Sequence, residues 1–492
     1  MNIDELIKRE EGKTLEFKRD LSSPKNFLKT LVAFANTAGG QVIIGVEDKT
    51  RLPVGVEHPL DEEERLCSLI ADSIRPRLVP NVEMITFAGK TLLVVEVFLS
   101  GSRPHWLEAE GPEGGVYVRL GSSNRQADRE LIAELRRSVD GVAFDELPMP
   151  ELSADDLELA AVKTLFRDQR ELGENELLTL RLLTNEQGRL VPTKGAVLLF
   201  GKGRRRHFPD AWVQCGRFIG RDKADIFDHI ELYDHLPQAV DSIMMFLKKH
   251  AMRGADFAEV RRKDVWSIPL GILREAVINA LVHADYSQRG APTRIAFFDD
   301  RIEIENPGIL LPGMTIEDMH QGVSKIRNHV IARIFRELKL IEQWGSGVRR
   351  MFKEADEQGL PAPEIVEVGM RMRFIMHLAE PVTIQTNKRQ VTSEVVEKTT
   401  PQVTPQVTPQ VTQLLKTLAG EMDRGSLQAE LGLSARKNFR ILYLTPALRD
   451  GLIEMTIPDK PNSRMQKYRL TSKGKQVVLE LLTGGNEENG QL

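Results

Sequence analysis

The feature that most constrains the fold is a tandem repeat near the carboxyl end, TTPQVTPQVTPQVT, at residues 399–412. Its Pro-Gln-Val-Thr units place a proline at every fourth position, which prevents a regular helix, and they offer no surface from which a core could form. We therefore predict an extended linker between separately folded parts. The length of 492 residues predicts about three domains, because single cores stop growing well below this size.

Composition narrows the protein class. The net charge of −4 is small for this length, so nucleic-acid binding would depend on local basic patches. Cys67 and Cys215 are the only cysteines, which excludes a disulfide framework or a cysteine-rich zinc site and fits a reducing cytoplasm. The first residues lack the apolar core of a signal peptide, and no apolar run is long enough to span a bilayer. We expect a cytoplasmic protein.

Helix and strand patterns alternate before the repeat. Residues 23–40 have the pattern of an amphipathic helix stopped by Gly39-Gly40, whereas QVIIGVED and KTLLVVEVF are typical of strands. The expected fold class is α+β and multidomain. The expected segments are 1–140, an α/β domain; 141–265, a connecting α/β region; 266–380, the middle domain proper; 381–412, the repeat linker; 413–483, a compact tail domain; and 484–492, a flexible end.

A polar stripe crosses an otherwise apolar helix in LREAVINALVHADYS, residues 273–287. Glu275, Asn279 and His283 follow one another at steps of four, which places all three on one narrow helix face. An ATPase without a P-loop needs such a pair, since a carboxylate can activate water and an amide oxygen can bind Mg²⁺. The alternative is a helix whose polar face is satisfied inside the protein.

Two glycine-containing segments follow this helix. A predicted strand runs into Asn306-Pro307-Gly308, and Gly345-Ser346-Gly347 opens a further helical stretch. Glycines let backbone amides approach phosphate at such places. In this order the pieces, over about residues 269–378, resemble the GHKL ATPase superfamily, which includes gyrase and histidine kinases, and in particular its divergent branch in bacterial RecG-related proteins and putative transcriptional regulators.

The resemblance implies an α/β sandwich that binds ATP with Mg²⁺. It makes Glu275 the general base, Asn279 the Mg²⁺ ligand, Asn306 and Gly308 the adenine-side loop, and Gly345, Ser346 and Gly347 the phosphate-side loop. The superfamily usually has an aspartate where this chain has Asn306, whose amide oxygen still accepts a hydrogen bond but carries no charge. Lys325, Arg327 and Asn328 could face phosphate or form a solvated helix face. No Gly-x-x-x-x-Gly-Lys-Ser/Thr loop is present, so we do not expect a P-loop helicase.

Acidic residues gather in the amino-terminal sequence. EGKTLEFKRD contains Glu11, Glu16 and Lys18, and Asp48 ends a predicted strand. Carboxylates that converge beside a lysine are the ingredients of a divalent-metal phosphodiesterase site. The alternative is that these residues cap and solvate the ends of secondary-structure elements.

The segments TLEFKRD, AFANTAGGQVIIGVED and YVRLGSSNRQA, over about residues 1–135, resemble the Schlafen/AlbA-like domain. In the nuclease members two glutamates and an aspartate hold the metal, which implies Glu11, Glu16 and Asp48 as ligands of Mg²⁺ or Mn²⁺ and Lys18 as a catalytic neighbour. Other members only bind nucleic acid. Arg119, Asn124 and Arg125 would then contact phosphate, or they form a basic hairpin rim.

The tail after the repeat resembles a winged helix. Two helices flank a turn at Gly432, and two strands surround PDKPNSR. The second helix carries Arg436, Lys437 and Arg440, which would enter the major groove of DNA. Winged helices also join proteins, and this alternative stays open.

These observations predict an ATP-responsive nucleic-acid-binding protein, either a DNA-binding transcriptional regulator or a phage-defence factor. DNA is the expected partner and RNA the alternative. A second hypothesis is a metal-dependent Schlafen-like nuclease controlled by nucleotide. A third is a dimerisation platform that has lost its nucleotide. We expect a homo-oligomer, a dimer or larger.

Overall fold

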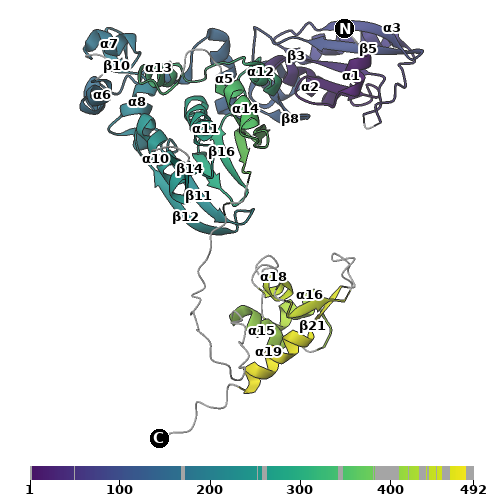
Figure 1. Ribbon diagram of the computed structural model, residues 1–492. Helices are drawn as coiled ribbons and strands as arrows, with labels where there is room; N and C mark the ends of the chain where they lie inside the picture. Colours follow the sequence, from purple (N-terminus) through teal and green to yellow (C-terminus); the bar gives the residue numbers. More distant parts are fainter. Residues whose placement is uncertain are drawn as a thin grey trace. The chain divides into compact units, whose positions relative to one another are not determined.

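The computed structural model describes residues 3–48, 50–167, 172–251, 253–256, 263–341, 347–379, 382, 409–418, 420–431, 439, 443–449, 451–456 and 466–483. They divide into two compact units, residues 1–386 and 387–492, and we describe each unit by itself. The fold is mixed α+β and multidomain, as predicted (Figure 1). Within these ranges, no helix combines the length and apolarity that crossing a bilayer requires.

The amino-terminal domain is built on a four-stranded sheet. Its strands lie in the order β1 (Leu15–Lys18), β2 (Gly40–Ile44), β5 (Lys90–Val97) and β4 (Asn81–Phe87), with β1 and β2 parallel and the other pairs antiparallel. Helix α2 (Pro24–Asn36) starts with proline, whose fixed φ suits a first helical turn, and buries Phe27, Leu31 and Phe34 in the core. The other elements are α1 (Ile3–Lys8), α3 (Pro59–Ser73), β3 (Ile74–Arg75), β6 (Trp106–Leu107), α4 (Gly111–Gly114), the hairpin of β7 (Tyr117–Leu120) and β8 (Ser123–Gln126), and α5 (Arg129–Asp140).

The middle domain contains a six-stranded sheet. Its order is β12 (Asp225–Leu232), β11 (Val213–Ile219), β15 (Thr293–Phe297), β16 (Arg301–Pro307), β18 (Arg371–His377) and β17 (Glu364–Val368). Only β11 and β15 pair in parallel among these strands. Helix α11 (Leu270–His283) packs against β16 and between α10 (Leu236–His250) and α14 (Gly347–Glu357). Because α11 is enclosed in this way, most of its circumference is apolar, as the sequence pattern indicates.

Smaller elements surround this sheet. They are α6 (Leu159–Phe166), α7 (Glu174–Thr179), β9 (Leu183–Glu186), β10 (Arg189–Pro192), α8 (Lys194–Phe200), α9 (Arg204–His207), β13 (Arg253–Asp256), β14 (Lys263–Trp266), α12 (Ile316–Gln321) and α13 (His329–Glu337).

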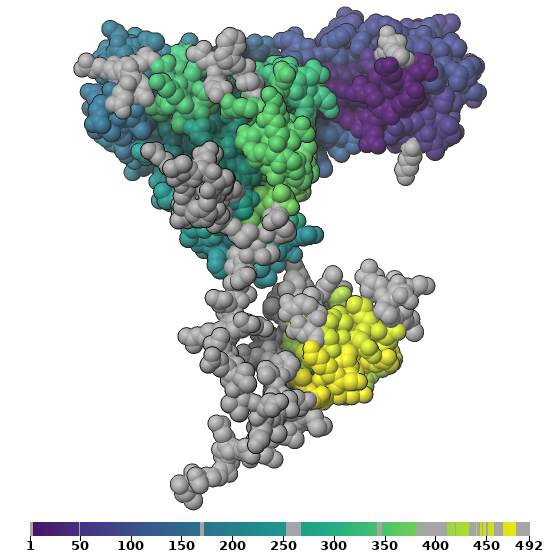
Figure 2. Space-filling model, viewed as in Figure 1, coloured from purple at the N-terminus to yellow at the C-terminus, as the bar shows by residue number. Residues whose placement is uncertain are grey.

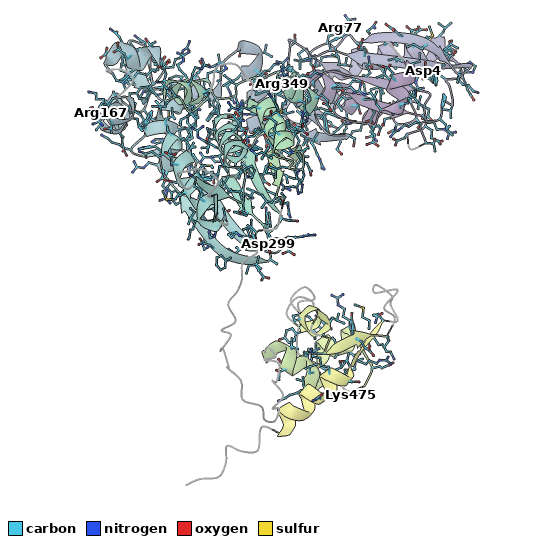
Figure 3. All side chains as sticks on the ribbon, viewed as in Figure 1. Asp4, Arg77, Arg167, Asp299, Arg349 and Lys475 are labelled. Carbon is cyan, nitrogen blue, oxygen red and sulfur yellow. The ribbon has the colours of Figure 1, made fainter. Side chains whose placement is uncertain are left out.

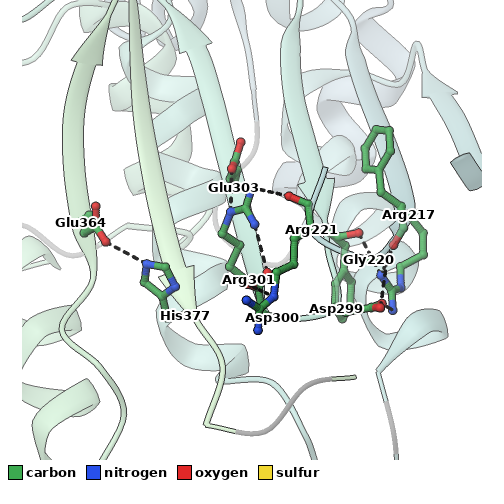
Figure 4. A network of polar contacts seen from close by, with 11 residues as sticks. Arg217, Gly220, Arg221, Asp299, Asp300, Arg301, Glu303, Glu364 and His377 are labelled. Carbon is green, nitrogen blue, oxygen red and sulfur yellow. Dashed lines mark hydrogen bonds and ion pairs between the residues drawn. The ribbon is translucent and has the colours of Figure 1, made fainter. Parts of the chain in front are cut away.

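A network of ion pairs stabilises one end of the sheet (Figure 4). Arg217, fully buried on β11, donates to Asp299 Oδ1 at 2.7 Å, and Asp299 Oδ2 accepts from the backbone nitrogen of Gly220 at 2.9 Å. Figure 3 shows Asp299 and Arg349 of α14 at opposite ends of the domain. Since the network satisfies its own charges, we interpret it as structural.

The amino-terminal and middle domains meet within one compact unit, and their surfaces adjoin in Figure 2. Lys13 Nζ contacts Glu367 Oε1 of β17 at 2.8 Å, and Arg327 pairs with Glu134 of α5. The backbone nitrogen of Gly313 donates to the Thr37 carbonyl at 2.6 Å. Polar contacts from three separate segments therefore join the two domains.

The second unit has its own core. Its elements are α15 (Pro409–Thr417), β19 (Met422–Asp423), α16 (Arg424–Glu430), α18 (Thr445–Arg449), β20 (Ile453–Met455), β21 (Lys467–Leu470) and α19 (Ser472–Thr483), and its antiparallel sheet has the order β19-β21-β20. Val411, Leu414, Leu427, Phe439 and Leu452 are buried together. The linker expected over residues 381–412 therefore ends earlier, because α15 begins at Pro409 inside the last Pro-Gln-Val-Thr unit, where proline suits a first helical turn and Val411 packs in the core. The winged-helix assignment stays a prediction, and Arg436, Lys437 and Arg440 lie outside the described residues.

Candidate functional site

The predicted amino-terminal cluster forms at one edge of the four-stranded sheet. Glu16 and Lys18 lie on β1, Glu11 precedes that strand, and Asp48 follows its parallel neighbour β2. The parallel pairing brings the ends of β1 and β2, and thus Lys18 and Asp48, to the same edge. Glu11 joins them because the chain before β1 folds back, with the backbone nitrogen of Gly12 donating to the Leu15 carbonyl at 3.0 Å. Glu11 Oε1 accepts from the backbone nitrogen of Phe17 at 2.7 Å. Burial raises the pKa of Glu11, and the nearby carboxylates of Glu16 and Asp48 raise it further.

Glu16 is already neutralised inside the protein. One carboxylate oxygen pairs with Lys18 and the other with Arg119, whose side chain is 1 % exposed. Arg119 also donates to the Gly12 carbonyl at 3.0 Å and to Asn124 Oδ1 at 2.9 Å. Both Glu16 oxygens thus have cationic partners, and a buried guanidinium beside them would repel a divalent ion.

The residues present do not fit a metal ion in this arrangement. Within the ranges that the structure describes, no three His, Cys, Asp or Glu side chains are placed to hold one together. The three carboxylates that the sequence proposes as ligands do approach one another. However, Lys18 and Arg119 already supply the positive charge that a metal ion would bring. We therefore derive no catalytic step through a metal here.

The predicted phosphate contacts of the β7–β8 hairpin need a correction. Arg119 is buried, and its guanidinium is used by Glu16, Gly12 and Asn124, so it cannot reach a phosphate. Asn124 connects Arg119 to Thr30, to whose Oγ1 it donates at 2.9 Å. Arg125 is exposed and stays available for nucleic acid. The error arises because the packing of α2 against β7, not the local basic sequence, decides which way Arg119 faces.

The polar stripe of α11 lines a cavity of about 470 Å³ in the middle domain, and Asn306 also borders it. Glu275, Asn279 and His283 all contribute to its wall, so the stripe faces an open space instead of a packed core. A volume of this size lies within the range of about 300–1,000 Å³ that is usual for small-molecule sites.

Glu275 is held at the amino-terminal end of α14. Asn279 Nδ2 donates to its Oε1 at 3.2 Å, and Arg350 Nη2 of α14 donates to its Oε2 at 3.1 Å. Gly347, the first residue of α14, lies so close that an added Cβ would overlap Glu275 Oε1. The structure therefore brings the predicted base and the predicted phosphate-side loop together at Gly347, while Gly345 and Ser346 lie outside the described residues.

The adenine-side loop closes another part of the wall. Asn306 is buried at the end of β16, and its amide nitrogen donates to the Pro307 carbonyl at 3.1 Å. Gly308 has a φ of +100°, which disfavours a side chain, and a Cβ there would lie 2.9 Å from Asp285 Cβ and 3.1 Å from Arg327 Cζ. Glycine is thus required by both the backbone conformation and the space.

Positive charge surrounds the cavity. Among the residues that the structure describes, five basic side chains and one carboxylate, Glu275, contribute to its lining; the basic residues are Lys325, Arg327, Arg336, Arg350 and Arg373. The sequence leaves open whether Lys325 and Arg327 face phosphate or solvent, and it does not single out the other three. The one available signal for Arg350 is its place in VRR, directly after Gly347. Arg327, Arg350 and Arg373 pair with Glu134, Glu275 and Glu305, so the five cations stand against three carboxylates and the remaining positive charge favours an anionic ligand.

Asn328, for which the sequence leaves open a phosphate contact or a solvated helix face, is buried instead. Its amide nitrogen donates to the carbonyls of Val282 and Ala284 at 2.8 Å each, at the end of α11. It therefore fixes the end of the helix that carries the stripe. His283 lies on that last turn, where burial and then the Arg327 charge lower its pKa to about 4, so its imidazole is neutral at pH 7.

The residues of the central cavity fit a magnesium nucleotide. Asn279 and Glu275 offer the hard oxygen atoms that Mg²⁺ prefers, and Asn279 donates through its nitrogen, which leaves the amide oxygen for a metal. The basic residues suit phosphates, and the apolar part of the lining, which includes Ile304, Met314 and Phe374, suits a base.

Sequence models of three domain families match the chain. Residues 11–128 match Schlafen, AlbA_2. Residues 290–376 match HATPase_c_4, described as the carboxyl-terminal part of putative ATP-dependent DNA helicase RecG, and residues 409–471 match the carboxyl-terminal domain of Fic-like proteins (filamentation induced by cAMP). The Schlafen/AlbA and HATPase-type domains expected from the sequence are thereby confirmed. No curated protein matches the chain.

Similar solved structures include three bacterial proteins. The DIP2311 protein from Corynebacterium diphtheriae is 18 % identical, with 95 % of this chain and 94 % of that chain covered and a TM-score of 0.41. The amino-terminal domain of a putative ATP-dependent DNA helicase RecG-related protein from Nitrosomonas europaea is 32 % identical over 25 % of this chain and 90 % of that chain, with a TM-score of 0.21. A Fic family protein from Desulfovibrio desulfuricans is 16 % identical over 70 % and 77 %, with a TM-score of 0.13.

In chain order, the sequence thus contains regions that match a Schlafen AlbA_2 domain, an HATPase_c_4 domain and the carboxyl-terminal domain of Fic-like proteins.

Proposed function

We propose that the protein is an ATP-responsive nucleic-acid-binding protein, of the kind that serves as a DNA-binding transcriptional regulator or a phage-defence factor. The observation that carries the proposal is the central cavity, whose described lining combines Glu275 and Asn279 with five basic side chains. The matches of the chain to Schlafen AlbA_2 and HATPase_c_4 support a nucleic-acid-related and ATP-linked role.

In this proposal each side chain of the cavity has a separate role. Asn279 would hold Mg²⁺, which when bound neutralises phosphate charge, and Glu275 would orient water. Arg350 reaches the cavity from α14 and already contacts Glu275, so it can exchange the carboxylate for a phosphate when nucleotide enters.

A chain of contacts supports coupling between nucleotide and the amino-terminal domain. Arg327 lines the cavity and pairs with Glu134 of α5. Gly313, between the cavity residues Leu311 and Met314, donates to Thr37, and Thr37 Oγ1 accepts from the backbone nitrogen of Arg119 at 2.9 Å. A ligand that moves the 309–314 segment would thus move groups next to Glu16.

The decisive experiment is calorimetry of the full-length protein with a non-hydrolysable ATP analogue and Mg²⁺. We expect Asn279→Ala to weaken binding about ten-fold or more, because it removes a metal ligand. Lys353→Ala is the matched control, since this exposed α14 side chain lies outside the cavity lining. Absence of binding by the wild-type protein would favour the dimerisation platform, and light scattering would then test the expected homo-oligomer.

Nucleic-acid affinity tests the coupling and the nuclease alternative together. We expect the analogue to change the affinity of the wild-type protein for labelled DNA, and the change to shrink in Glu134→Gln. Glu11, Glu16 and Asp48 lie close together, so a nuclease is the second candidate, but it requires that the ion pairs of Glu16 with Lys18 and Arg119 open to admit a metal. Cleavage that needs Mg²⁺ or Mn²⁺ and disappears in Glu16→Gln, with binding intact, would replace the regulator by the nuclease.

A further inference from the structure

A second cavity, of about 450 Å³, lies between α5, α8 and the segment at residues 285–291. It is separate from the nucleotide cavity, since Asp285 lines the second cavity and Arg327 lines the first, with Gly308 packed between them. Its size is also within the usual range for small-molecule sites, about 300–1,000 Å³. Neither the predicted function nor the matched families account for it.

Two cations that line this cavity lie near the same aromatic ring. Arg137 of α5 and Lys194 of α8 are both partly buried, and they approach the ring of Phe144 with their charged groups 5.4 and 4.3 Å from its centroid. Among the residues that the structure describes, neither side chain forms a salt bridge or donates a hydrogen bond. Burial lowers the pKa of Lys194, and the Arg137 charge lowers it further. Glu134 and Asp285 lie near Arg137, and Glu151 lies near Lys194, but none of them forms a salt bridge with these two cations in the described part of the chain. Both cations are therefore free to bind an anion that is supplied from outside.

The cavity also contains an acceptor without a donor. Asp285 is 3 % exposed, and its Oδ1 accepts from the backbone nitrogen and the hydroxyl of Ser287 at 3.0 and 2.6 Å. Its Oδ2 is buried and has no hydrogen-bond partner in the described part of the chain. A buried carboxylate oxygen is costly to leave unpaired, so this atom indicates a ligand that donates a hydrogen bond.

We propose that this cavity binds a phosphate monoester whose organic part carries a hydroxyl or amino donor. Arg137 and Lys194 would bind the phosphate, and Asp285 Oδ2 would accept from the donor. A phosphate monoester carries nearly two negative charges at neutral pH, which matches the two cations better than a carboxylate does. This chemistry occurs both in free sugar phosphates or nucleotides and at the 5′-phosphorylated end of a nucleic acid.

The test is binding of glucose 6-phosphate, and of oligonucleotides with a 5′-phosphate or a 5′-hydroxyl, to the full-length protein. We expect Lys194→Gln to weaken binding of the phosphorylated probe about ten-fold or more, and Lys163→Gln, an exposed lysine of α6, to leave it unchanged. Arg137→Gln is the second variant, in case Lys194→Gln disturbs folding. Asp285→Asn should weaken glucose 6-phosphate more than inorganic phosphate, which has no organic part.

The outcomes separate the sources. A preference for the 5′-phosphate over the 5′-hydroxyl oligonucleotide, lost in Lys194→Gln, assigns the cavity to nucleic-acid ends, whereas binding of glucose 6-phosphate alone assigns it to a free metabolite. The proposal is overturned if no phosphorylated probe binds, or if binding persists in both Lys194→Gln and Arg137→Gln. Affinity for the Mg²⁺ nucleotide should not change in Lys194→Gln, so failure here is distinguishable from failure of the central site.

Discussion

The amino-terminal domain and the middle domain each contain an ion pair between a glutamate and an arginine, but the surroundings of the two pairs differ. Glu16 and Arg119 have side chains that are 9 % and 1 % exposed, and further polar contacts fix the arginine on two sides. Glu275 and Arg350 are 13 % and 45 % exposed, and both border a cavity. The first pair is closed against ligands, and the second can rearrange around one. The same two residue types therefore serve structure in one domain and are open to function in the other.

The largest effect should come from removing the buried arginine. Arg119→Met leaves the buried carboxylate of Glu16 with Lys18 alone, so we expect a loss of about 3–5 kcal/mol in the free energy of unfolding of the amino-terminal domain. Arg125→Met, at an exposed site on the same hairpin, should change it by less than about 0.5 kcal/mol. The free energy of unfolding of both variants is measured by denaturant titration, with hydrogen exchange of the β1 amides as the probe of the amino-terminal domain. Equal stability of the two variants would show that the comparison between the domains is wrong.

Acid should weaken the middle domain through His283. Its pKa in the folded protein is lowered from 6.5 to about 4, so the unfolded chain takes up a proton first as the pH falls. The stabilising contribution is complete above pH 6.5 and is lost as the pH falls through about 4, at a cost of about 3 kcal/mol at pH 4. His283→Gln should flatten the pH dependence of unfolding in this window, and His58→Gln, at an exposed site, should not. Glu11 has the opposite sign, because its raised pKa favours folding at low pH.

Gly347 tests the close approach of α14 to Glu275. In Gly347→Ala the new methyl group would collide with the Glu275 carboxylate, so we expect a cost of about 1–3 kcal/mol in stability together with weaker nucleotide binding. Gly101→Ala is the control, because a Cβ there meets nothing within 4 Å. Melting of the two variants with and without the nucleotide analogue provides the measurement. A fully stable Gly347→Ala would mean that Glu275 moves freely.

The sequence predicts local features of these sites better than their partners. The four-residue spacing of Glu275, Asn279 and His283 is a property of one helix, and the structure places all three in one cavity. Asn328 has a partner 44 residues away, and spacing along the chain carries no information about such a contact.

The start of α13 gives a second example. It is capped by Asp145, which accepts from the backbone nitrogen atoms of His329, Val330 and Ile331 at 3.0, 2.7 and 2.9 Å. Asp145 precedes His329 by 184 residues in the chain. Such contacts are decided by the packing of whole elements, and this is also why Arg119 was misjudged.

Replacement of Glu275 should have the smallest effect on stability, and it is the sharpest test of the contrast with Glu16. Glu275→Gln keeps the shape of the side chain and an oxygen that can accept from Arg350, and the pair borders an open cavity that water can enter. We therefore expect less than about 1 kcal/mol of change in the free energy of unfolding, because a partly exposed ion pair contributes little. Nucleotide binding should persist, while any hydrolysis should fall, since an amide cannot take a proton from water.

Glu16→Gln is the matched substitution in the closed pair, where Arg119 keeps its buried charge, so it should cost more in stability than Glu275→Gln does. Unfolding midpoints, calorimetry with the ATP analogue and phosphate release on the same two variants decide the matter. If Glu275→Gln destabilises as much as Glu16→Gln and hydrolysis is unaffected, then the polar stripe of α11 is structural and the central cavity has another use.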